Sequence, residues 1–314
     1  MSDFQPTTVS PPDTFKDDPR IGHLLGENID DPLEARAVLL GFPSDEGVRI
    51  NGGRPGAADA PDMIRDALYS MTPDARTSGF ADLVRRTVDV GNLKLGGRLE
   101  DHQTQLGRAL APYLARGVVP IVLGGGHETA YGHFRGYVEA ERSVAILNWD
   151  AHADVRPLRN GRAHSGSPFR QALEDASGRC AGYTVAGLLP HSTATAHVEY
   201  LTDQGGQAIW ANELAADQIS ALYAGWSTPV MATFDLDAVD QRAAPGVSAP
   251  AVGGIALSLW REAAYWAGRC PQVTSFDLVE YNPRVDSDGC TARVAALTVW
   301  EFLRGLAARS AEAK

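Results

Sequence analysis

SVAILNWDAHAD (143–154) joins a continuous apolar run to three polar side chains at alternate positions, Asp150, His152 and Asp154. An apolar run of this length without polar alternation predicts a strand that is buried on both faces, as in a parallel sheet covered by helices. Residues i and i+2 that leave a strand point in the same direction. We therefore expect the three side chains to face one spot beyond the end of this strand.

Two other stretches repeat this pattern. TPVMATFDLD (228–237) ends in Asp235 and Asp237, and VVPIVLGGGHE (118–128) places His127 after a run of glycines. Parallel α/β sheets bind ligands beyond the carboxyl ends of their strands, so we expect the three loops to converge there. The glycines lie in neither a GxGxxG nor a GxxxxGK[ST] motif, so they indicate close backbone packing rather than a nucleotide site.

The six polar side chains of these loops comprise four carboxylates and two imidazoles, without a thiolate. Oxygen-rich ligation with some nitrogen favours Mn²⁺ over a structural Zn²⁺, and six ligands are too many for one tetrahedral ion. Helix N-caps and buried ion pairs at strand ends are the alternative interpretation, but it does not explain the clustering. The sequence therefore predicts a two-metal site that comprises His127, Asp150, His152, Asp154, Asp235 and Asp237.

The rest of the chain continues the alternation of short apolar runs and amphipathic stretches from about residue 34 onward. This alternation predicts a three-layer α/β/α fold with a mostly parallel sheet of about eight strands. Strands are expected at 36–42, 87–91, 118–124, 143–149, 183–188, 207–211, 228–234 and 273–279. Helices are expected at 57–71, 101–116, 128–141, 167–177, 194–204, 212–224, 256–268 and 291–309.

The domain organisation follows from the same pattern. No internal repeat or long linker interrupts the alternation, so we expect residues 34–314 to form a single catalytic domain. The first twenty residues are rich in Pro, Ser, Thr and Asp and lack the basic start and apolar core of a signal peptide. Residues 1–33 are therefore expected to form a flexible N-terminal arm.

The bulk composition limits the possible partners. A formal net charge of -11 argues against nucleic acid or an anionic membrane as the main partner, and no apolar stretch reaches membrane-spanning length. The cysteines Cys180, Cys270 and Cys290 are odd in number and form no CxxC motif. This usage is typical of a reducing compartment, so we expect a cytoplasmic protein.

The order of the motifs resembles that of the ureohydrolase family, which includes arginase, agmatinase and formimidoylglutamase. The motifs are GGGHE (124–128), DAHAD (150–154), DLDAVD (235–240), SFDLVEYNP (275–283) and TARVAALTVWEFL (291–303). The resemblance covers nearly everything after residue 34 and implies an arginase-like fold. Four further features are most similar to the formimidoylglutamase branch: GFPSDEGVRINGGRPGAADAP (41–61), GGGHETAYGHFRGY (124–137), Arg156 directly beyond DAHAD, and SGSPFRQAL (165–173).

The resemblance implies two Mn²⁺ ions per subunit. One ion would be held by His127, Asp150, Asp154 and Asp235. The other would be held by Asp150, His152, Asp235 and Asp237, so that Asp150 and Asp235 bridge the pair. Two bridged ions share a water molecule and lower its pKa, which generates hydroxide at neutral pH.

The resemblance also implies a reaction, the cleavage of the C–N bond of N-formimidoyl-L-glutamate to L-glutamate and formamide in histidine degradation. The metal-bridging hydroxide would attack the amidine carbon. Asp154 would orient this hydroxide, Glu280 would hold the cationic amidine, and His164 would act as general acid for the leaving nitrogen. Together with Glu280, the residues expected to bind the substrate are Arg156 and Ser165.

Some alternatives stay open on the sequence alone. Arg159 and Arg162 of the basic segment 155–165 are either cations for a dicarboxylate substrate or solvated surface charges. The chain could instead act on a guanidine as an agmatinase, guanidinobutyrase or arginase, although a basic loop would repel a cationic tail. An inactive, metal-stabilised scaffold is the third possibility. The family resemblance implies a homo-oligomer, a trimer or a hexamer.

Overall fold

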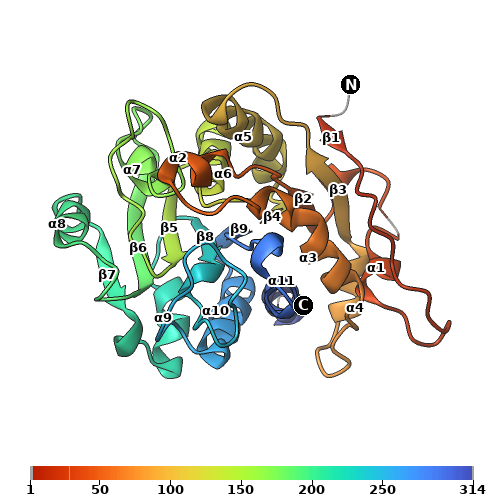
Figure 1. Ribbon diagram of the computed structural model, residues 1–314. Coiled ribbons are helices and arrows are strands. Elements are labelled where there is room, and N and C mark those ends of the chain that lie inside the picture. The colour runs from red at the N-terminus through yellow and green to blue at the C-terminus, as the bar shows by residue number, and fades with distance from the viewer. Residues whose placement is uncertain (1–2, 28, 313–314) are drawn as a thin grey trace.

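The computed structural model describes residues 3–27 and 29–312, and its centre is one nine-stranded sheet with helices on both faces (Figure 1). The strand order is β1-β3-β2-β4-β9-β8-β5-β6-β7, and every neighbouring pair is parallel except β1 with β3. The strands are β1 (Phe4–Gln5), β2 (Ala37–Gly41), β3 (Thr87–Leu93), β4 (Val119–Leu123), β5 (Val144–Trp149), β6 (Cys180–Leu188), β7 (Gln207–Trp210), β8 (Val230–Asp235) and β9 (Val273–Val279).

The α-helices cover the sheet in two groups, which gives the three layers. Helices α5, α6, α7 and α8 contribute to the core on one face, and α1, α3, α4, α9, α10 and α11 contribute to the core on the other. The α-helices of the described chain are α1 (Ile21–Leu24), α2 (Glu46–Asn51), α3 (Ala60–Tyr69), α4 (Phe80–Arg85), α5 (Leu99–Arg116), α6 (Thr129–Glu139), α7 (Pro168–Leu173), α8 (Thr195–Asp203), α9 (Ile219–Ala224), α10 (Leu257–Arg269) and α11 (Cys290–Glu312).

The central strands are buried on both faces because their sequences are continuously apolar. All residues of β4, β5 and β8 are buried, and alternate side chains of each strand enter the two cores. Helix α5 begins where the Asp101 carboxylate accepts the backbone N–H of Arg98 at 2.9 Å, and it ends at Gly117, whose φ is 73°. Local capping and burial therefore agree with the pattern that predicted the fold.

The predicted fold is confirmed, with one strand more than expected. All eight expected strands are present, and β1 is the additional, antiparallel edge strand. Helices α1, α2 and α4 were not expected, and each has at most six residues. Within the described residues, no helix combines the length and apolar character needed to cross a membrane.

The N-terminal segment lies along the edge of the sheet. Strand β1 pairs with β3, and the side chains of Ile21 and Leu24 are buried against the core that contains α3 and α4. The flexibility of the arm 1–33 and the extent of the catalytic domain 34–314 stay predictions. Residues 1, 2, 28, 313 and 314 of these two ranges lie outside the described residues.

Candidate metal centre

The register of four adjacent strands brings the predicted ligand loops to one level. Trp149 of β5 pairs with Phe234 of β8, Phe234 pairs with Leu278 of β9, and Leu278 pairs with Leu123 of β4. The ligand loops follow directly after these positions in the sequence. The convergence predicted from i and i+2 spacing is therefore produced by the hydrogen-bonded register of the sheet.

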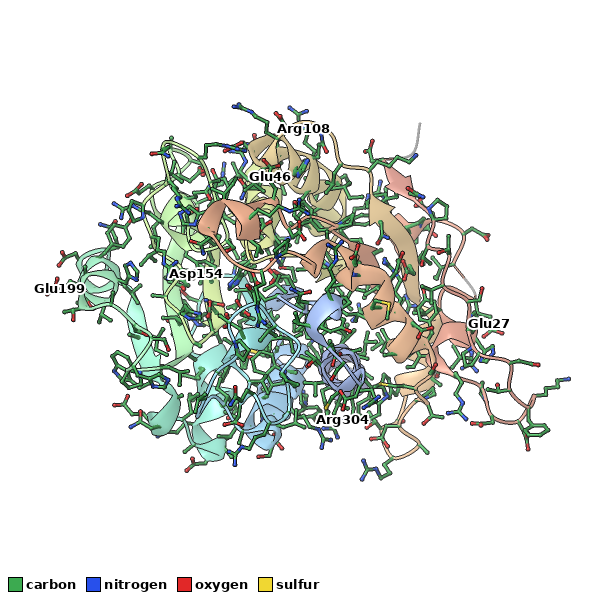
Figure 2. All side chains as sticks on the ribbon, viewed as in Figure 1. Glu27, Glu46, Arg108, Asp154, Glu199 and Arg304 are labelled. Atoms are coloured by element: carbon green, nitrogen blue, oxygen red, sulfur yellow. The ribbon has the colours of Figure 1, made fainter. Side chains whose placement is uncertain are left out.

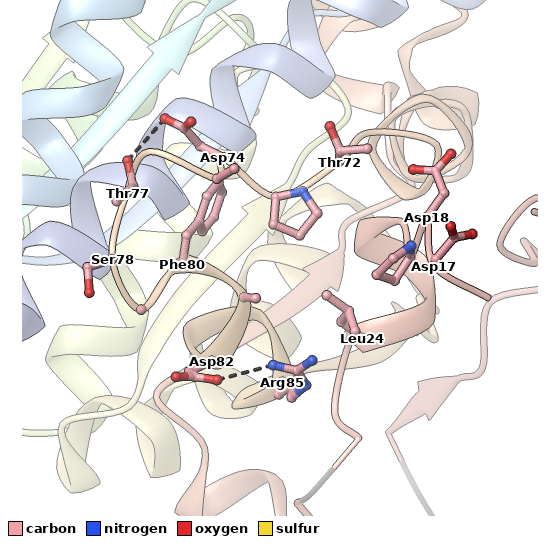
Figure 3. Close-up of a pocket in the computed structure, with 15 residues that line it drawn as sticks. Asp17, Asp18, Leu24, Thr72, Asp74, Thr77, Ser78, Phe80, Asp82 and Arg85 are labelled. Carbon is pink, nitrogen blue, oxygen red and sulfur yellow. Dashed lines mark hydrogen bonds and ion pairs between the residues drawn. The ribbon is translucent and has the colours of Figure 1, made fainter. Parts of the chain in front are cut away.

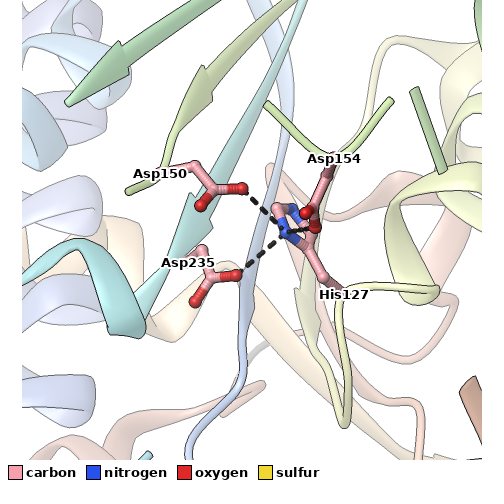
Figure 4. Close-up of side chains that lie close together, drawn as sticks. All are labelled: His127, Asp150, Asp154 and Asp235. Carbon is pink, nitrogen blue, oxygen red and sulfur yellow. Dashed lines mark ion pairs between the residues drawn. The ribbon is translucent and has the colours of Figure 1, made fainter. Parts of the chain in front are cut away.

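The first group of side chains surrounds one imidazole nitrogen (Figure 4). The Nδ1 atom of His127 lies 3.2 Å from an oxygen of Asp150, 3.1 Å from Asp154 and 2.9 Å from Asp235. This nitrogen is buried and has no hydrogen-bond partner in the described chain. Ligand atoms at right angles around an ion with bonds of roughly 2.1 Å are about 3 Å apart, so the spacing fits a divalent cation.

A second group of side chains adjoins the first. His152 Nδ1 lies 3.5 Å from Asp150 and 3.3 Å from Asp237, and Oδ1 of Asp237 has no hydrogen-bond partner in the described residues. Asp150 belongs to both groups, with Oδ2 toward His127 and Oδ1 toward His152. Asp235 groups with the first set alone. The bridging role of Asp235 stays a prediction, whereas Asp150 has the position of a bridge.

The backbone orients the carboxylates. The peptide N–H of His152 donates to Asp150 at 2.6 Å, and that of Asp237 donates to Asp235 at 2.8 Å. Asn148 donates a side-chain hydrogen bond of 3.0 Å to Asp150. Asp154 has a φ of 44°, in the left-handed region that costs a non-glycine residue about 1–3 kcal/mol. Such strain is often found at functional sites, and here it directs a predicted ligand toward the cluster.

The electrostatics of the cluster favour cations. Burial, together with the charges of Asp237 and Asp150, raises the pKa of Asp235 well above its ordinary value. For Asp150, burial is outweighed by the nearby imidazoles of His127 and His152, whose positive charge lowers its pKa. The charge of Asp237 raises the pKa of His152 to about 12. Crowded, buried carboxylates thus repel one another unless positive charge lies between them, and oxygen-rich sites of this kind suit Mn²⁺.

Glu280 lies directly beyond β9, at the edge of the cluster. Its φ is 65°, and its Oε1 accepts the backbone N–H of His127 at 2.8 Å. Burial and the charge of Asp237 raise the pKa of Glu280 to about 8. A carboxylate in this environment is stabilised by a positive partner, which is the property expected for an amidinium-binding group.

The cluster opens into a cavity of about 250 Å³. The predicted site residues that line this cavity are His152, Asp154, Arg156, Ser165, Asp235, Asp237 and Glu280. Asn51 of α2 also lines it, and links two of the others: its Nδ2 donates to Ser165 Oγ at 3.1 Å, and its Oδ1 accepts from Arg156 at 3.1 Å. The residues expected to bind the substrate therefore share one cavity with the metal-ligand side chains.

The structure does not bring His164 to this cavity. The ring Nε2 of His164 lies 3.1 Å from the carbonyl oxygen of Pro157, and Nδ1 accepts the backbone N–H of Gly166 at 3.1 Å. Burial lowers its pKa. The ring beside the cluster is instead that of Phe169, which packs edge-on against the imidazole of His127, with ring centroids 5.1 Å apart. His164 therefore braces its own loop, and this placement does not support the predicted general-acid role.

The other arginines of segment 155–165 contact α2 instead of lining the cavity. Arg162 donates to Glu46 at 2.6 Å, and Arg159 donates to the carbonyl oxygen of Ile50 at 2.7 Å. Arg159 is exposed and Arg162 is half-buried. These contacts attach segment 155–165 to α2. This description fits them better than the two interpretations left open by the sequence, which were substrate binding and free solvation.

Two side chains beside the site were not predicted from the sequence, Asn51 and Glu128. Asn51 lies in the segment 41–61 that carries the family resemblance, but no local pattern indicates that its side chain reaches the cavity. Glu128 is buried next to His127 and accepts the backbone N–H of Gly47 in α2 at 2.8 Å. A Cβ at Gly125 would lie 1.8 Å from the carbonyl oxygen of Ser44, so only glycine allows the two backbone segments around Gly125 and Ser44 to pack this closely.

A wider cavity of about 610 Å³ lies elsewhere, between the N-terminal segment and the loop that leads into α4 (Figure 3). Asp17, Asp18, Asp74 and Asp82 line it, and Asp82 pairs with Arg85 at 3.1 Å. None of the predicted site residues contributes to it. The labelled Asp154 lies inside the outline of the molecule, whereas Arg108, Glu199 and Arg304 lie toward its periphery (Figure 2). The smaller cavity, which seven of the predicted site residues line, is therefore the candidate site.

Comparisons with known proteins agree with this geometry. The family model described as the arginase family matches residues 35–304. A formimidoylglutamase of Geobacillus thermodenitrificans is 39% identical over 282 residues, which cover 87% of this chain and 85% of that protein. A formimidoylglutamase of Salmonella heidelberg is 37% identical over 282 residues, with coverage of 86% and 85%.

A solved structure is similar over nearly the whole fold. The Trypanosoma cruzi formiminoglutamase with Mn²⁺₂ superposes with a TM-score of 0.84 and 30% sequence identity, over 93% of this chain and 99% of that chain. With a matching family model over most of its length and relatives that are 37% to 39% identical over the aligned residues, this chain belongs to the arginase family.

Proposed function

We propose that this chain is a hydrolase of linear amidines that converts N-formimidoyl-L-glutamate and water to L-glutamate and formamide. Formimidoylglutamases at 37% to 39% identity support the assignment. The observation that carries it is the cavity beside the metal-ligand side chains, because Arg156 and Glu280 both line it. A guanidinium suits the carboxylates of a glutamate tail, and a buried carboxylate suits a cationic amidine.

The side chains fit two Mn²⁺ ions, which agrees with the Mn²⁺ in the structure of the Trypanosoma relative. His127, Asp150, Asp154 and Asp235 would hold one ion, and Asp150, His152 and Asp237 would hold the other, with Asp235 as a further bridge. Two ions bound there supply Lewis-acid activation of water at neutral pH. The chain's own contribution is to hold both ligand sets in one orientation before the substrate arrives.

Glu280 binds and orients the reacting group. One oxygen of its carboxylate is held by the backbone N–H of His127, so the group cannot turn away from the cavity. A salt-bridged amidinium carbon is a better electrophile than a neutral amidine carbon, and the raised pKa of Glu280 falls again when a cation lies against it. Glu280 thus selects the protonated formimidoyl group and presents it to the nucleophile.

The nitrogen of glutamate must take up a proton when the C–N bond breaks. Asp154 both belongs to the first ligand set and lines the cavity, so its carboxylate can orient the attacking water and carry this proton. The resemblance predicted His164 as the general acid, but His164 does not line the cavity, and both of its ring nitrogens contact the backbone of its own loop. We therefore assign the proton transfer to Asp154.

The substrate tail lies against the α2 side of the cavity. Asn51 connects Arg156 and Ser165 by hydrogen bonds, so the three side chains form one polar wall. The Arg156 guanidinium binds a tail carboxylate, and the Ser165 hydroxyl donates to it. A pocket that binds a negatively charged group, as this wall would, discriminates strongly against a substrate with a cationic tail, because the misplaced charge is left without a partner. We further propose that the protein forms a homo-oligomer, either a trimer or a hexamer, and that it is located in the cytoplasm.

The decisive experiment is a substrate panel with Mn²⁺-loaded enzyme. N-formimidoyl-L-glutamate is compared with agmatine, 4-guanidinobutyrate and L-arginine, and the released formamide or urea is measured as kcat/KM for each compound. We expect N-formimidoyl-L-glutamate to exceed the others by more than about 10³-fold, in line with the discrimination of polar pockets. A preference for agmatine or guanidinobutyrate would make the chain another ureohydrolase. Bound Mn²⁺ without turnover of any compound would favour the inactive scaffold.

A further inference from the structure

A buried chain of hydrogen-bonding side chains leads from His127 away from the cavity. Nε2 of His127 lies 3.1 Å from Oγ1 of Thr233 on β8, and this hydroxyl donates to Oδ1 of Asp277 on β9 at 2.6 Å. The other carboxylate oxygen of Asp277 lies 2.6 Å from Nδ1 of His133 on α6. The side chains of all four residues are at most 1% exposed.

The direction of these hydrogen bonds determines the tautomer of His127. A hydroxyl has one proton, and Thr233 donates it to Asp277, so the Thr233 oxygen can only accept from the imidazole. Nε2 of His127 therefore carries a proton. Neutral His127 then has its lone pair on Nδ1, which is the nitrogen that faces Asp150, Asp154 and Asp235. The opposite tautomer would direct an N–H into the cluster and leave Asp277 Oδ1 without its donor.

The series of hydrogen bonds ends at His133, which does not line the cavity. His133 donates to Asp277 through Nδ1, and its Nε2 is buried without a hydrogen-bond partner in the described chain. None of Thr233, Asp277 and His133 lines the cavity. Their side-chain hydrogen bonds reach the site through the imidazole of His127, so the role considered for them is to position this ring.

The two ligand sets differ in this respect. His127 is held from behind by the buried chain and from the side by the ring of Phe169. The side chain of His152, by contrast, is 23% exposed and lines the cavity. The imidazole of the first set is therefore oriented before a metal binds, whereas that of the second set is free on its cavity side.

We propose that Thr233, Asp277 and His133 are positioning residues that hold His127 as the Nε2–H tautomer and thereby set the affinity of the first ion selectively. This inference rests on the two-metal site of the proposed function. Hydrogen bonds to a metal-binding imidazole fix its ring orientation and raise its basicity, and their loss typically weakens metal binding by roughly 10- to 100-fold. Asp150 connects the two sets, but the second lacks His127, so its ion is affected much less.

The test uses Thr233→Val, which removes the hydroxyl and keeps the shape of the side chain. Thr184→Val is the matched control, because Thr184 is also a buried strand threonine, in β6, and its hydroxyl has no hydrogen-bond partner in the described residues. Chelated proteins are titrated with Mn²⁺ by calorimetry, and the ion pair is followed by electron paramagnetic resonance. We expect Thr233→Val to bind one ion 10- to 100-fold more weakly and the other within about threefold of the original protein.

Three further variants keep the test decisive. Thr233→Ser restores a hydroxyl and should restore both affinities, whereas Asp277→Asn and His133→Phe should weaken the same single ion. If Thr233→Val does not fold, the comparison of Asp277→Asn with Thr184→Val decides the question. Unchanged affinities in Thr233→Val, equal weakening of both ions, or the same change in Thr184→Val would each overturn the positioning role. Failure of the unmodified protein to bind two Mn²⁺ ions would instead overturn the proposed function.

Discussion

The two sides of the cavity are built in different ways. The metal-ligand side comes from loops that directly follow β4, β5 and β8, and its carboxylates Asp150 and Asp235 are each held by the backbone N–H two residues further along. The substrate side comes from α2 and segment 155–165, which meet through side chains more than 100 positions apart in the sequence. The first side is local and buried, and the second is long-range and partly exposed.

This difference separates chemistry from selectivity. If one member of a buried set of carboxylates and imidazoles is substituted, another buried charge loses its partner. Substitutions in this set should therefore abolish turnover rather than reduce it gradually. The substrate side consists of polar contacts near solvent, each of which contributes a limited amount. Changes on the metal side should therefore abolish turnover, and changes on the substrate side should alter KM. The following predictions test this division in order of decreasing effect.

Asp150→Ala should give the largest loss. Asp150 has one oxygen toward each imidazole of the cluster, so its removal disturbs both ligand sets at once. One preorganised electrostatic group is often worth 10²- to 10³-fold in rate, and we expect the loss of both ions to exceed about 10³-fold. Metal analysis of the purified variant, together with kcat, provides the measurement. A variant that keeps two Mn²⁺ ions and full turnover would contradict the bridging position of Asp150.

Glu280→Gln should keep the metals and lose most of the rate. The amide can still accept the backbone N–H of His127 but cannot balance a cationic amidine. Loss of a charge-assisted interaction in a buried site costs about 3 kcal/mol, or roughly a hundredfold in kcat. Steady-state kinetics and elemental analysis on the same preparation test this. A metal-depleted or unfolded variant would make Glu280 a structural support of the His127 loop instead.

Arg156→Ala should raise KM about 10- to 100-fold and change kcat little, because it binds the substrate tail equally in the ground and transition states. Arg162→Ala is the matched control, since Arg162 pairs with Glu46 and does not line the cavity. Its effect should be less than about fivefold.

Asn51→Ala should resemble Arg156→Ala, because Asn51 holds the Arg156 guanidinium. The two changes together should therefore be less than additive. If Arg162→Ala raises KM as much as Arg156→Ala does, the substrate side would be a general cationic surface rather than a specific contact.

The same division explains what the sequence could predict. Ligands such as Asp150 and Asp235 follow apolar strands at i, i+2 spacing, so local geometry alone places them on one side of the sheet. Asn51 could not be found in this way, because its role depends on contacts with Arg156 and Ser165 across more than 100 residues. Helix α2 has six residues and no strong periodicity, so no local pattern indicates it.

At His164 the resemblance and the geometry indicate different roles. It lies in the correct segment and has the correct chemistry, yet its ring nitrogens contact the backbone of its own loop. His164→Ala is therefore expected to lower kcat less than about tenfold, compared with roughly 10²- to 10⁴-fold for the loss of a general acid. Added imidazole should not restore the rate. A loss above a hundredfold that imidazole reverses would return the general-acid role to His164.

The smallest effect concerns the stability of the metal-free protein, and it follows from the sign of two pKa shifts. Burial raises the pKa of Glu280 from 4.5 to about 8, and the charge of Asp237 raises that of His152 from 6.5 to about 12. Each group binds its proton more tightly in the folded state. The associated stability is therefore lost as the pH rises, from 4.5 to about 8 for Glu280 and from 6.5 upward for His152.

Between pH 6.5 and 8 both shifts act in the same direction, so the chelated protein should melt at a lower temperature at pH 8, by about 2–4 °C for each kcal/mol lost. The Mn²⁺-loaded protein should not show this decrease, because metal binding requires deprotonated ligands and strengthens as the pH rises. Thermal melts of both forms at the two pH values measure the difference. In metal-free Glu280→Gln the decrease should be smaller, since the amide does not titrate. Equal melting temperatures of the chelated protein at both pH values would show that the cluster is already neutralised by its own protons, and the electrostatic contrast between the two sides of the cavity would then be weaker than the structure indicates.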